Sequence, residues 1–100
     1  MKPLVVIWSD RAWEDLETIF DLIAINSQIQ AEKQVFRILD RAEQLSSQPL
    51  SGPLQPEIDP ELKARYFVQD NYKIIYFIAD EKIVVDTIFD TRQDPEKLKL

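Results

Sequence analysis

The feature that most constrains the fold is a change of hydrophobic period on the two sides of a proline-rich segment. Residues 46–62 contain four of the six prolines and the only glycine of the chain. Because proline lacks a backbone donor and restricts φ, this segment predicts a loop. Before it, apolar residues recur every three or four positions, and after it they form short β-rich runs. We therefore expect helices N-terminal to the loop and strands C-terminal to it.

Two amphipathic helices are predicted before the loop. Ser9 can cap the first helix and Ser27 can cap the second. The apolar positions of each helix follow one another at spacings of three and four, as expected for one buried face. They are Ala12, Leu16, Ile19 and Ile23 in the first helix, and Ala31, Val35, Ile38, Ala42 and Leu45 in the second. Because so few residues separate the helices, we expect an antiparallel helical hairpin.

Four strands complete the predicted fold. One precedes the helices and three follow the loop, at residues 4–8, 64–69, 72–79 and 82–89. The last three are separated by Asp70-Asn71 and Asp80-Glu81, which fit two-residue turns. The fold class is therefore α+β, with an N-terminal strand and an antiparallel helical hairpin packed on a mainly antiparallel sheet, which a C-terminal three-strand meander completes. We expect a single domain of residues 1–100, with a short helix opening at Pro95.

The predicted meander has two unequal faces. If both turns contain two residues, cross-strand partners share a face. The apolar face, which should receive the helices, holds Arg65, Phe67, Ile74, Tyr76, Ile78, Ile83, Val85 and Phe89. The mixed face holds Tyr66, Val68, Lys73, Ile75, Phe77, Lys82, Val84, Asp86 and Ile88. A face that is both apolar and charged indicates a partner-binding surface, although a slip of one residue would exchange the two assignments. An ion pair between Lys73 and Asp86 is expected on it.

Composition excludes several kinds of chemistry. The chain has no cysteine and no histidine, which excludes thiolate catalysis, histidine-assisted nucleophiles and histidine-ligated zinc. We expect no metal and no cofactor. No apolar run is long enough to cross a bilayer and the N-terminal stretch lacks the pattern of a signal peptide, so a cytoplasmic protein is expected. The net charge of −6 opposes binding to nucleic acid.

Four segments, taken in order, resemble the RelE/ParE superfamily of bacterial toxins. Trp8-Ser9-Asp10-Arg11-Ala12 is similar to the start of the family's first helix, and Leu45, Pro49 and Gly52 precede the loop. Tyr72-Lys73-Ile74-Ile75-Tyr76 resembles the family's Tyr-Arg-x-x-Tyr strand. Residues 88–95 resemble its strand-to-tail signature. The resemblance covers nearly the whole chain and implies the toxin component of a type II toxin–antitoxin system, bound and neutralised by a cognate antitoxin in a hetero-oligomer.

The superfamily divides by activity. RelE-like members cut mRNA in the ribosome with a cluster of lysine and arginine, often with a C-terminal tyrosine, whereas ParE-like members inhibit DNA gyrase by binding. Here Lys73 replaces the strand arginine and lacks its bidentate fork. The remaining candidates for a ribonuclease site are Arg65 and Arg92, and neither tyrosine nor histidine follows residue 76. The ParE-like activity is therefore favoured over a RelE-like endonuclease or a weakly toxic, degenerate member.

Five residues are predicted to contact a protein partner, whether antitoxin, gyrase or, in the alternative, the ribosome with its mRNA. Four lie on the mixed sheet face, and Arg92 lies in the tail. They are Lys73, Tyr66, Phe77, Asp86 and Arg92. For Arg92 a second interpretation stays open, a local ion pair with its neighbouring aspartates. Leu50, Leu54 and Ile58 are expected to attach the proline-rich loop to the body of the protein.

Overall fold

A computed structural model describes residues 2–55, 57 and 60–92, and it confirms the predicted α+β architecture. Two helices follow the first strand, and three strands follow the loop. The elements are β1 (Val5–Trp8), α1 (Asp10–Ala24), α2 (Gln28–Glu43), a single 3-10 turn η1 (Gln44–Ser46), β2 (Arg65–Gln69), β3 (Tyr72–Ala79) and β4 (Lys82–Asp90). The helix predicted at Pro95 lies outside the described residues.

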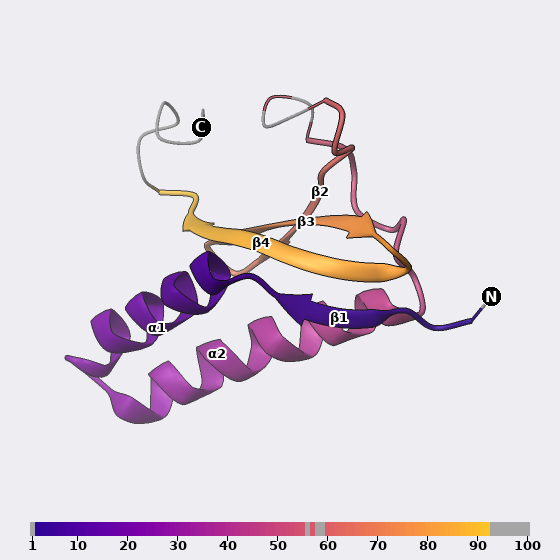
Figure 1. The fold of residues 1–100 in the computed structure, drawn as a ribbon. Coiled ribbons are helices and arrows are strands. Elements are labelled where there is room, and N and C mark those ends of the chain that lie inside the picture. Colours follow the sequence, from indigo (N-terminus) through magenta and orange to yellow (C-terminus); the bar gives the residue numbers. More distant parts are fainter. Residues whose placement is uncertain (1, 56, 58–59, 93–100) are drawn as a thin grey trace.

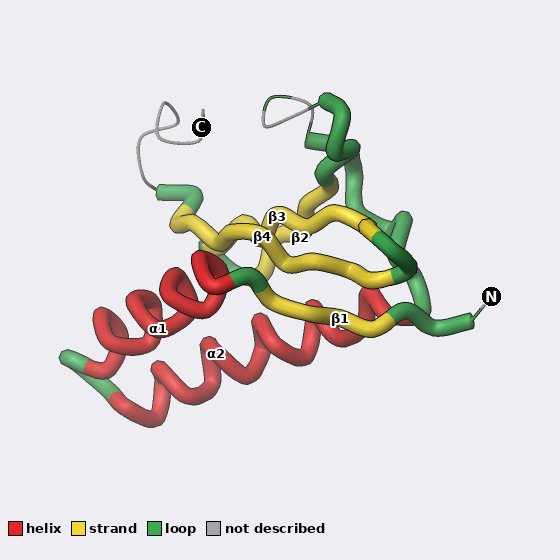
Figure 2. Tube along the Cα trace, in the orientation of Figure 1, coloured by secondary structure: helices red, strands yellow, loops and turns green. Residues whose placement is uncertain are grey.

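The four strands form one sheet in the order β1-β4-β3-β2. The three C-terminal strands are antiparallel neighbours, whereas β1 pairs with β4 in parallel. The two helices lie as an antiparallel hairpin across one face of this sheet, as Figures 1 and 2 show. The sheet is therefore mainly antiparallel, as predicted.

Serine caps begin both helices. The Oγ atom of Ser9 accepts from the backbone N–H of Ala12 at 3.0 Å, and the Oγ atom of Ser27 accepts from that of Gln30 at 3.2 Å. Each bond satisfies one of the donors that a helix leaves unpaired in its first turn. Ser9 also donates from Oγ to the carbonyl of Asp86 at 2.7 Å. The cap of α1 is thereby joined to β4.

One hydrophobic core lies between the hairpin and the sheet. Each of the two helices contributes the predicted small and branched residues, with Leu45 of η1 beside them. The buried members are Ala12, Leu16, Ile19, Ile38, Ala42, Leu45, Phe67, Tyr72, Ile74, Tyr76, Ile83, Val85 and Ile88. The strand residues of this set all lie on the side of the sheet that faces the helices, because cross-strand partners such as Ile74 and Ile88 share a face.

The assignment of residues to faces was wrong at the end of β4. Ile75 pairs with Thr87 and Tyr76 pairs with Val85, so Asp86 is the extra residue of a β-bulge. The bulge reverses the alternation beyond it. Ile88 lies opposite Ile74 in the core, and Phe89 lies opposite Lys73 on the other face. This second face, opposite the helices, is called the open face below.

The proline-rich loop is attached differently from the prediction. The side chains of Leu50 and Leu54 are exposed by 60% and 53%, so they do not attach the loop by apolar packing, and Ile58 lies outside the described residues. The Tyr76 hydroxyl instead donates to the carbonyl of Pro49 and accepts from the N–H of Gly52, both at 3.0 Å. Buried polar contacts hold the loop where apolar ones were expected.

Candidate functional site

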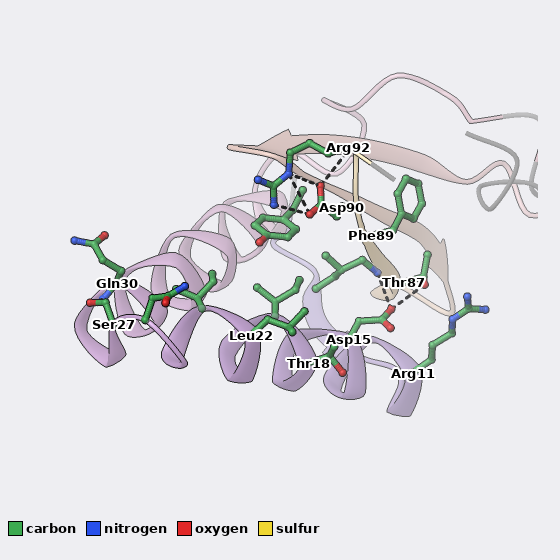
Figure 3. A pocket seen from close by; sticks show the side chains of 15 residues that line it. Arg11, Asp15, Thr18, Leu22, Ser27, Gln30, Thr87, Phe89, Asp90 and Arg92 are labelled. Carbon is green, nitrogen blue, oxygen red and sulfur yellow. Dashed lines mark hydrogen bonds and ion pairs between the residues drawn. The ribbon is translucent and has the colours of Figure 1, made fainter. Parts of the chain in front are cut away.

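Beyond the end of β1, helix α1 lies beside the second half of β4. β1 pairs with β4 only as far as Val85, whereas β4 continues to Asp90. The carboxylate of Asp15, on α1, accepts from the Thr87 hydroxyl and from the Ile88 N–H, each at 3.0 Å. The Asp15 carboxylate thus satisfies a backbone donor at the edge of the sheet. Figure 3 shows Asp15 and Thr87 at the wall of a groove.

The groove lies between α1, the start of α2, the first residue of β3 and the last residues of β4. Its volume is about 640 Å³. We call it the α1–β4 groove. Its walls combine apolar side chains, including Ile19, Leu22 and Ile23, with the polar groups of Asp15 and Arg92. Leu22 is 62% exposed although its neighbours Ile19 and Ile23 contribute to the core. A groove of this composition suits the apolar face of an amphipathic peptide segment.

At the rim of the groove, Arg92 forms a two-pronged ion pair with Asp90. Its Nη2 atom lies 2.6 Å from Oδ2 and its Nε atom lies 2.9 Å from Oδ1. The hydrogen bond from Arg92 holds the pKa of Asp90 below its ordinary value. The local ion pair considered for Arg92 is therefore formed, and the guanidinium still has an exposed outer edge. Beside it, burial raises the pKa of Tyr72, and the charge of Asp90 adds to that effect.

The open face carries three of the predicted partner-binding residues. The Lys73 ammonium lies 4.0 Å from the centre of the Tyr66 ring, a cation–π contact on neighbouring strands. Burial of the amine lowers the pKa of Lys73, against an opposing effect of Glu57. Phe77 is half-buried on the same face, opposite Val84. These side chains form a half-exposed aromatic and cationic surface.

Lys73 and Asp86, both among the described residues, do not form the expected ion pair. The bulge explains this difference. Asp86 has no cross-strand partner in the β3–β4 register, whereas Lys73 lies opposite Phe89. Asp86 instead contributes its carbonyl to the Ser9 hydroxyl.

The three candidates for a ribonuclease site are not brought together. Arg65 lies opposite Tyr76, and its Nη1 atom donates to the carbonyl of Gly52 at 2.7 Å. Lys73 is three residues from Tyr76 along β3 and therefore points to the other face of the sheet. Arg92 is paired with Asp90. Each of the three cations already has a partner within the fold.

Sequence reasoning missed two polar contacts between the layers. Asp70, in the turn between β2 and β3, accepts at Oδ2 from Arg37 Nε at 2.9 Å and from Gln34 Nε2 at 3.0 Å, which joins the turn to α2. Asp15 joins α1 to β4. Gln34 gave a signal, because it falls on the buried side of α2 at a position where an apolar residue is expected. Asp15 gave none, since it lies within a run of acidic residues.

Residues 2–55, 57 and 60–92 contain no group of three or more aspartate, glutamate, histidine or cysteine residues that could hold a metal ion. Within the same residues, neither helix has the length and apolar character required to cross a membrane.

The fold and the groove define a class of protein, a small α+β domain with a groove on its surface that suits a peptide segment. A solved structure titled "Chromosomal ParDE TA system from P. aeruginosa" has a similar fold, with a TM-score of 0.78 and 18% sequence identity. The match covers 92% of this chain and 100% of that chain. A search of curated proteins found no match.

The family follows from the sequence itself. The model of the family described as "ParE toxin of type II toxin-antitoxin system, parDE" matches residues 6–95. The chain therefore belongs to the ParE toxin family. This confirms the predicted superfamily and its ParE-like branch.

Proposed function

We propose that the chain arrests growth by binding DNA gyrase in the cytoplasm, and that a cognate antitoxin neutralises it. The observation that carries this proposal is the engagement of the basic side chains. Arg92 is paired with Asp90, Arg65 holds the loop, and Lys73 lies over Tyr66. RNA cleavage requires cations that converge on one phosphate, so this arrangement supports inhibition by binding.

The α1–β4 groove is the proposed docking site of the antitoxin. Its exposed Leu22 offers an apolar contact, and Arg92 at the rim offers a cation to an acidic partner residue. An amphipathic helix in a groove is a recurring mode of peptide recognition. The open face, with Lys73, Tyr66 and Phe77, is then left for the target. Asp86, the extra residue of the bulge in β4, is proposed to contact a partner as well.

Gyrase inhibition is tested with purified protein. The chain is added to gyrase and relaxed plasmid, and supercoiling and cleavage complexes are measured. We expect fewer supercoils, more cleavage complexes, or both. Tyr66→Ala should weaken the effect, whereas Leu50→Ala, at an exposed position of the loop, should leave it unchanged. If the chain leaves both readouts unaltered, gyrase is not the target.

The same preparation tests the ribonuclease alternative. In a translating extract, a RelE-like enzyme would cut mRNA at codon positions, and Lys73→Ala or Arg92→Ala would abolish the cuts. We expect intact message. A chain that neither cuts message nor affects gyrase, and that does not arrest growth when expressed, would instead be a weakly toxic member that retains antitoxin binding.

The antitoxin site is tested with two matched leucines. Leu22 lies in the groove and is 62% exposed, and Leu50 lies in the loop and is 60% exposed. Leu22→Asp is expected to weaken binding of the protein encoded beside this chain by at least about tenfold, because it places a charge in an apolar contact. Leu50→Asp should have little effect. Equal effects of the two substitutions, measured by calorimetry, would contradict the groove as the docking site.

A further inference from the structure

The charged side chains of the α1–β4 groove differ in whether the fold already uses them. Both carboxylates are engaged, because Asp15 accepts two hydrogen bonds from β4 and Asp90 accepts from Arg92. Arg11, also in the wall of the groove, forms no hydrogen bond or ion pair with any other residue that the structure describes. The groove thus has an unused cation, whereas both of its carboxylates already have donors.

Tyr72 supplies a second unused donor. The residue is buried, with 7% of its surface exposed, and it lies opposite Asp90 in the sheet. Its hydroxyl has no hydrogen-bond partner within the described part of the chain, although every fully buried polar side-chain atom there has one. The hydroxyl is therefore open to the groove that Tyr72 lines. Burial raises the pKa of Tyr72, so the group remains a protonated donor at neutral pH.

We propose that the groove selects an acidic amphipathic segment of the antitoxin, a pairing that rests on the proposed docking of the antitoxin in this groove. One carboxylate of the segment accepts from the Tyr72 hydroxyl and from the exposed edge of Arg92. A second carboxylate pairs with Arg11. Apolar side chains of the segment pack on Leu22, which is 62% exposed. Buried tyrosine hydroxyls usually have a partner, and the antitoxin carboxylate is the partner that Tyr72 lacks.

Two separate carboxylates are required, because the free donors come from different walls of the groove. Arg11 lies in the first turn of α1, whereas Arg92 follows the end of β4. Figure 3 shows these two side chains on either side of Asp15. The wall of the groove from Arg11 to Leu22 covers about 16 Å of α1, or three turns. A partner helix that lies along this wall presents its carboxylates and apolar residues on one face.

The hydrogen bonds inside the groove favour an acidic segment over a basic one. A basic segment could reach Asp15 only in competition with the donors of β4, and Asp90 only in competition with Arg92. A carboxylate meets donors that no described residue uses. The net charge of −6 repels an acidic partner at long range, so these contacts should slow dissociation and should not speed association.

Calorimetry with the protein encoded beside this chain tests the pairing. Tyr72→Phe should weaken binding at least about fivefold, because a hydrogen bond to a charged group is lost. It should leave the free energy of unfolding unchanged, since the hydroxyl has no partner among the described residues. Arg11→Gln should weaken binding at least about threefold. Lys33→Gln makes the same change of charge outside the groove and should leave binding unchanged.

Amide replacements in the partner locate the carboxylate that Tyr72 binds. Each acidic residue of the partner is changed in turn to its amide. One replacement should weaken binding to the wild-type chain at least about fivefold and have little further effect on binding to the Tyr72→Phe chain. If no replacement shows this coupling, the pairing with Tyr72 is overturned.

Leu22→Asp separates this pairing from the docking site on which it rests. If Leu22→Asp weakens binding while Tyr72→Phe and Arg11→Gln bind as tightly as Lys33→Gln, the acidic segment is overturned and the groove stands as the docking site. If Leu22→Asp has no effect, the docking site fails, and the pairing fails with it. Weaker binding of all three groove variants, with Lys33→Gln unchanged, is the result that we expect.

Discussion

At the scale of single residues, one buried hydroxyl group helps to hold the loop. Tyr76 is fully buried, and its hydroxyl group bonds both to Pro49 and to Gly52. Gly52 has a negative φ, so the position does not need glycine for its backbone conformation. It needs glycine for space. A Cβ atom there would lie 2.3 Å from the carbonyl oxygen of Tyr66 and 2.8 Å from the Tyr76 hydroxyl.

Gly52→Ala is therefore expected to destabilise the protein. The added methyl group meets a backbone atom that cannot move without disturbing β2, so the expected cost is about 1–3 kcal/mol in the free energy of unfolding. Urea denaturation followed by circular dichroism measures this cost. Ser51→Ala, at the exposed neighbouring position, is the control and should change stability by less than about 0.5 kcal/mol. Equal midpoints for the two variants would contradict the close contact.

At the scale of elements, Asp15 joins α1 to the part of β4 that β1 does not cover. Asp15→Ala would leave the Ile88 N–H and the Thr87 hydroxyl without this acceptor. Since a buried donor without a partner costs about 1–3 kcal/mol, we expect a loss of that size in the free energy of unfolding. Glu14→Ala, at the exposed neighbouring position on the same helix, should cost much less. Hydrogen exchange should also become faster at the Ile88 amide in the Asp15 variant alone.

The contact between α2 and the β2–β3 turn should depend on pH. Hydrogen bonds from Arg37, and then from Gln34 and Gln69, hold the pKa of Asp70 below its ordinary value of 3.8. A lowered pKa in the folded state means that the carboxylate stabilises the fold above about pH 3.8, and that this contribution is lost as the pH falls through the lower value. The pair is largely exposed, so the contribution should not exceed about 1 kcal/mol.

Asp70→Asn tests this prediction. Asparagine tolerates the positive φ of 57° at this position, so the backbone is preserved. The variant should lose stability at pH 6, and the difference from the wild type should shrink as the pH falls below 3.8. Asp80→Asn, at a φ of 52° in the other turn, is the control. If the two variants show the same pH profile in urea denaturation, the Asp70 contact does not contribute as described.

At the scale of the whole molecule, both helices and the sheet share one core. We therefore propose that residues 1–100 form a single domain that unfolds in one cooperative step. Trp8 and Trp13, whose rings lie 5.0 Å apart, report on β1 and α1 by fluorescence, whereas circular dichroism reports on all elements. The two signals should give the same urea midpoint. Ile38→Ala should lower the free energy of unfolding by about 2–5 kcal/mol and should shift the two urea midpoints together. Separate transitions would contradict the single domain.

The order and type of the elements followed from the sequence alone. The spacing of Ala12, Leu16 and Ile19 specifies a buried helix face whatever the helix packs against, because the period of a helix is local. Ser9 and Ser27 predicted both helix starts for the same reason, since a cap bonds within three residues. The proline-rich loop could be predicted from its local composition. The family resemblance could be predicted from the order of four short segments along the chain.

Only the tertiary structure decided the register at the end of β4 and the composition of the candidate site. The Asp86 bulge exchanges the faces of Ile88 and Phe89. The Ser9 hydroxyl contacts this bulge from 77 positions away, and the Asp15 carboxylate reaches Ile88 from 73 positions away. Local periodicity carries no information about contacts between residues so distant in the chain. The sequence by itself thus determined the elements and the family, whereas packing between distant residues determined which side chains meet.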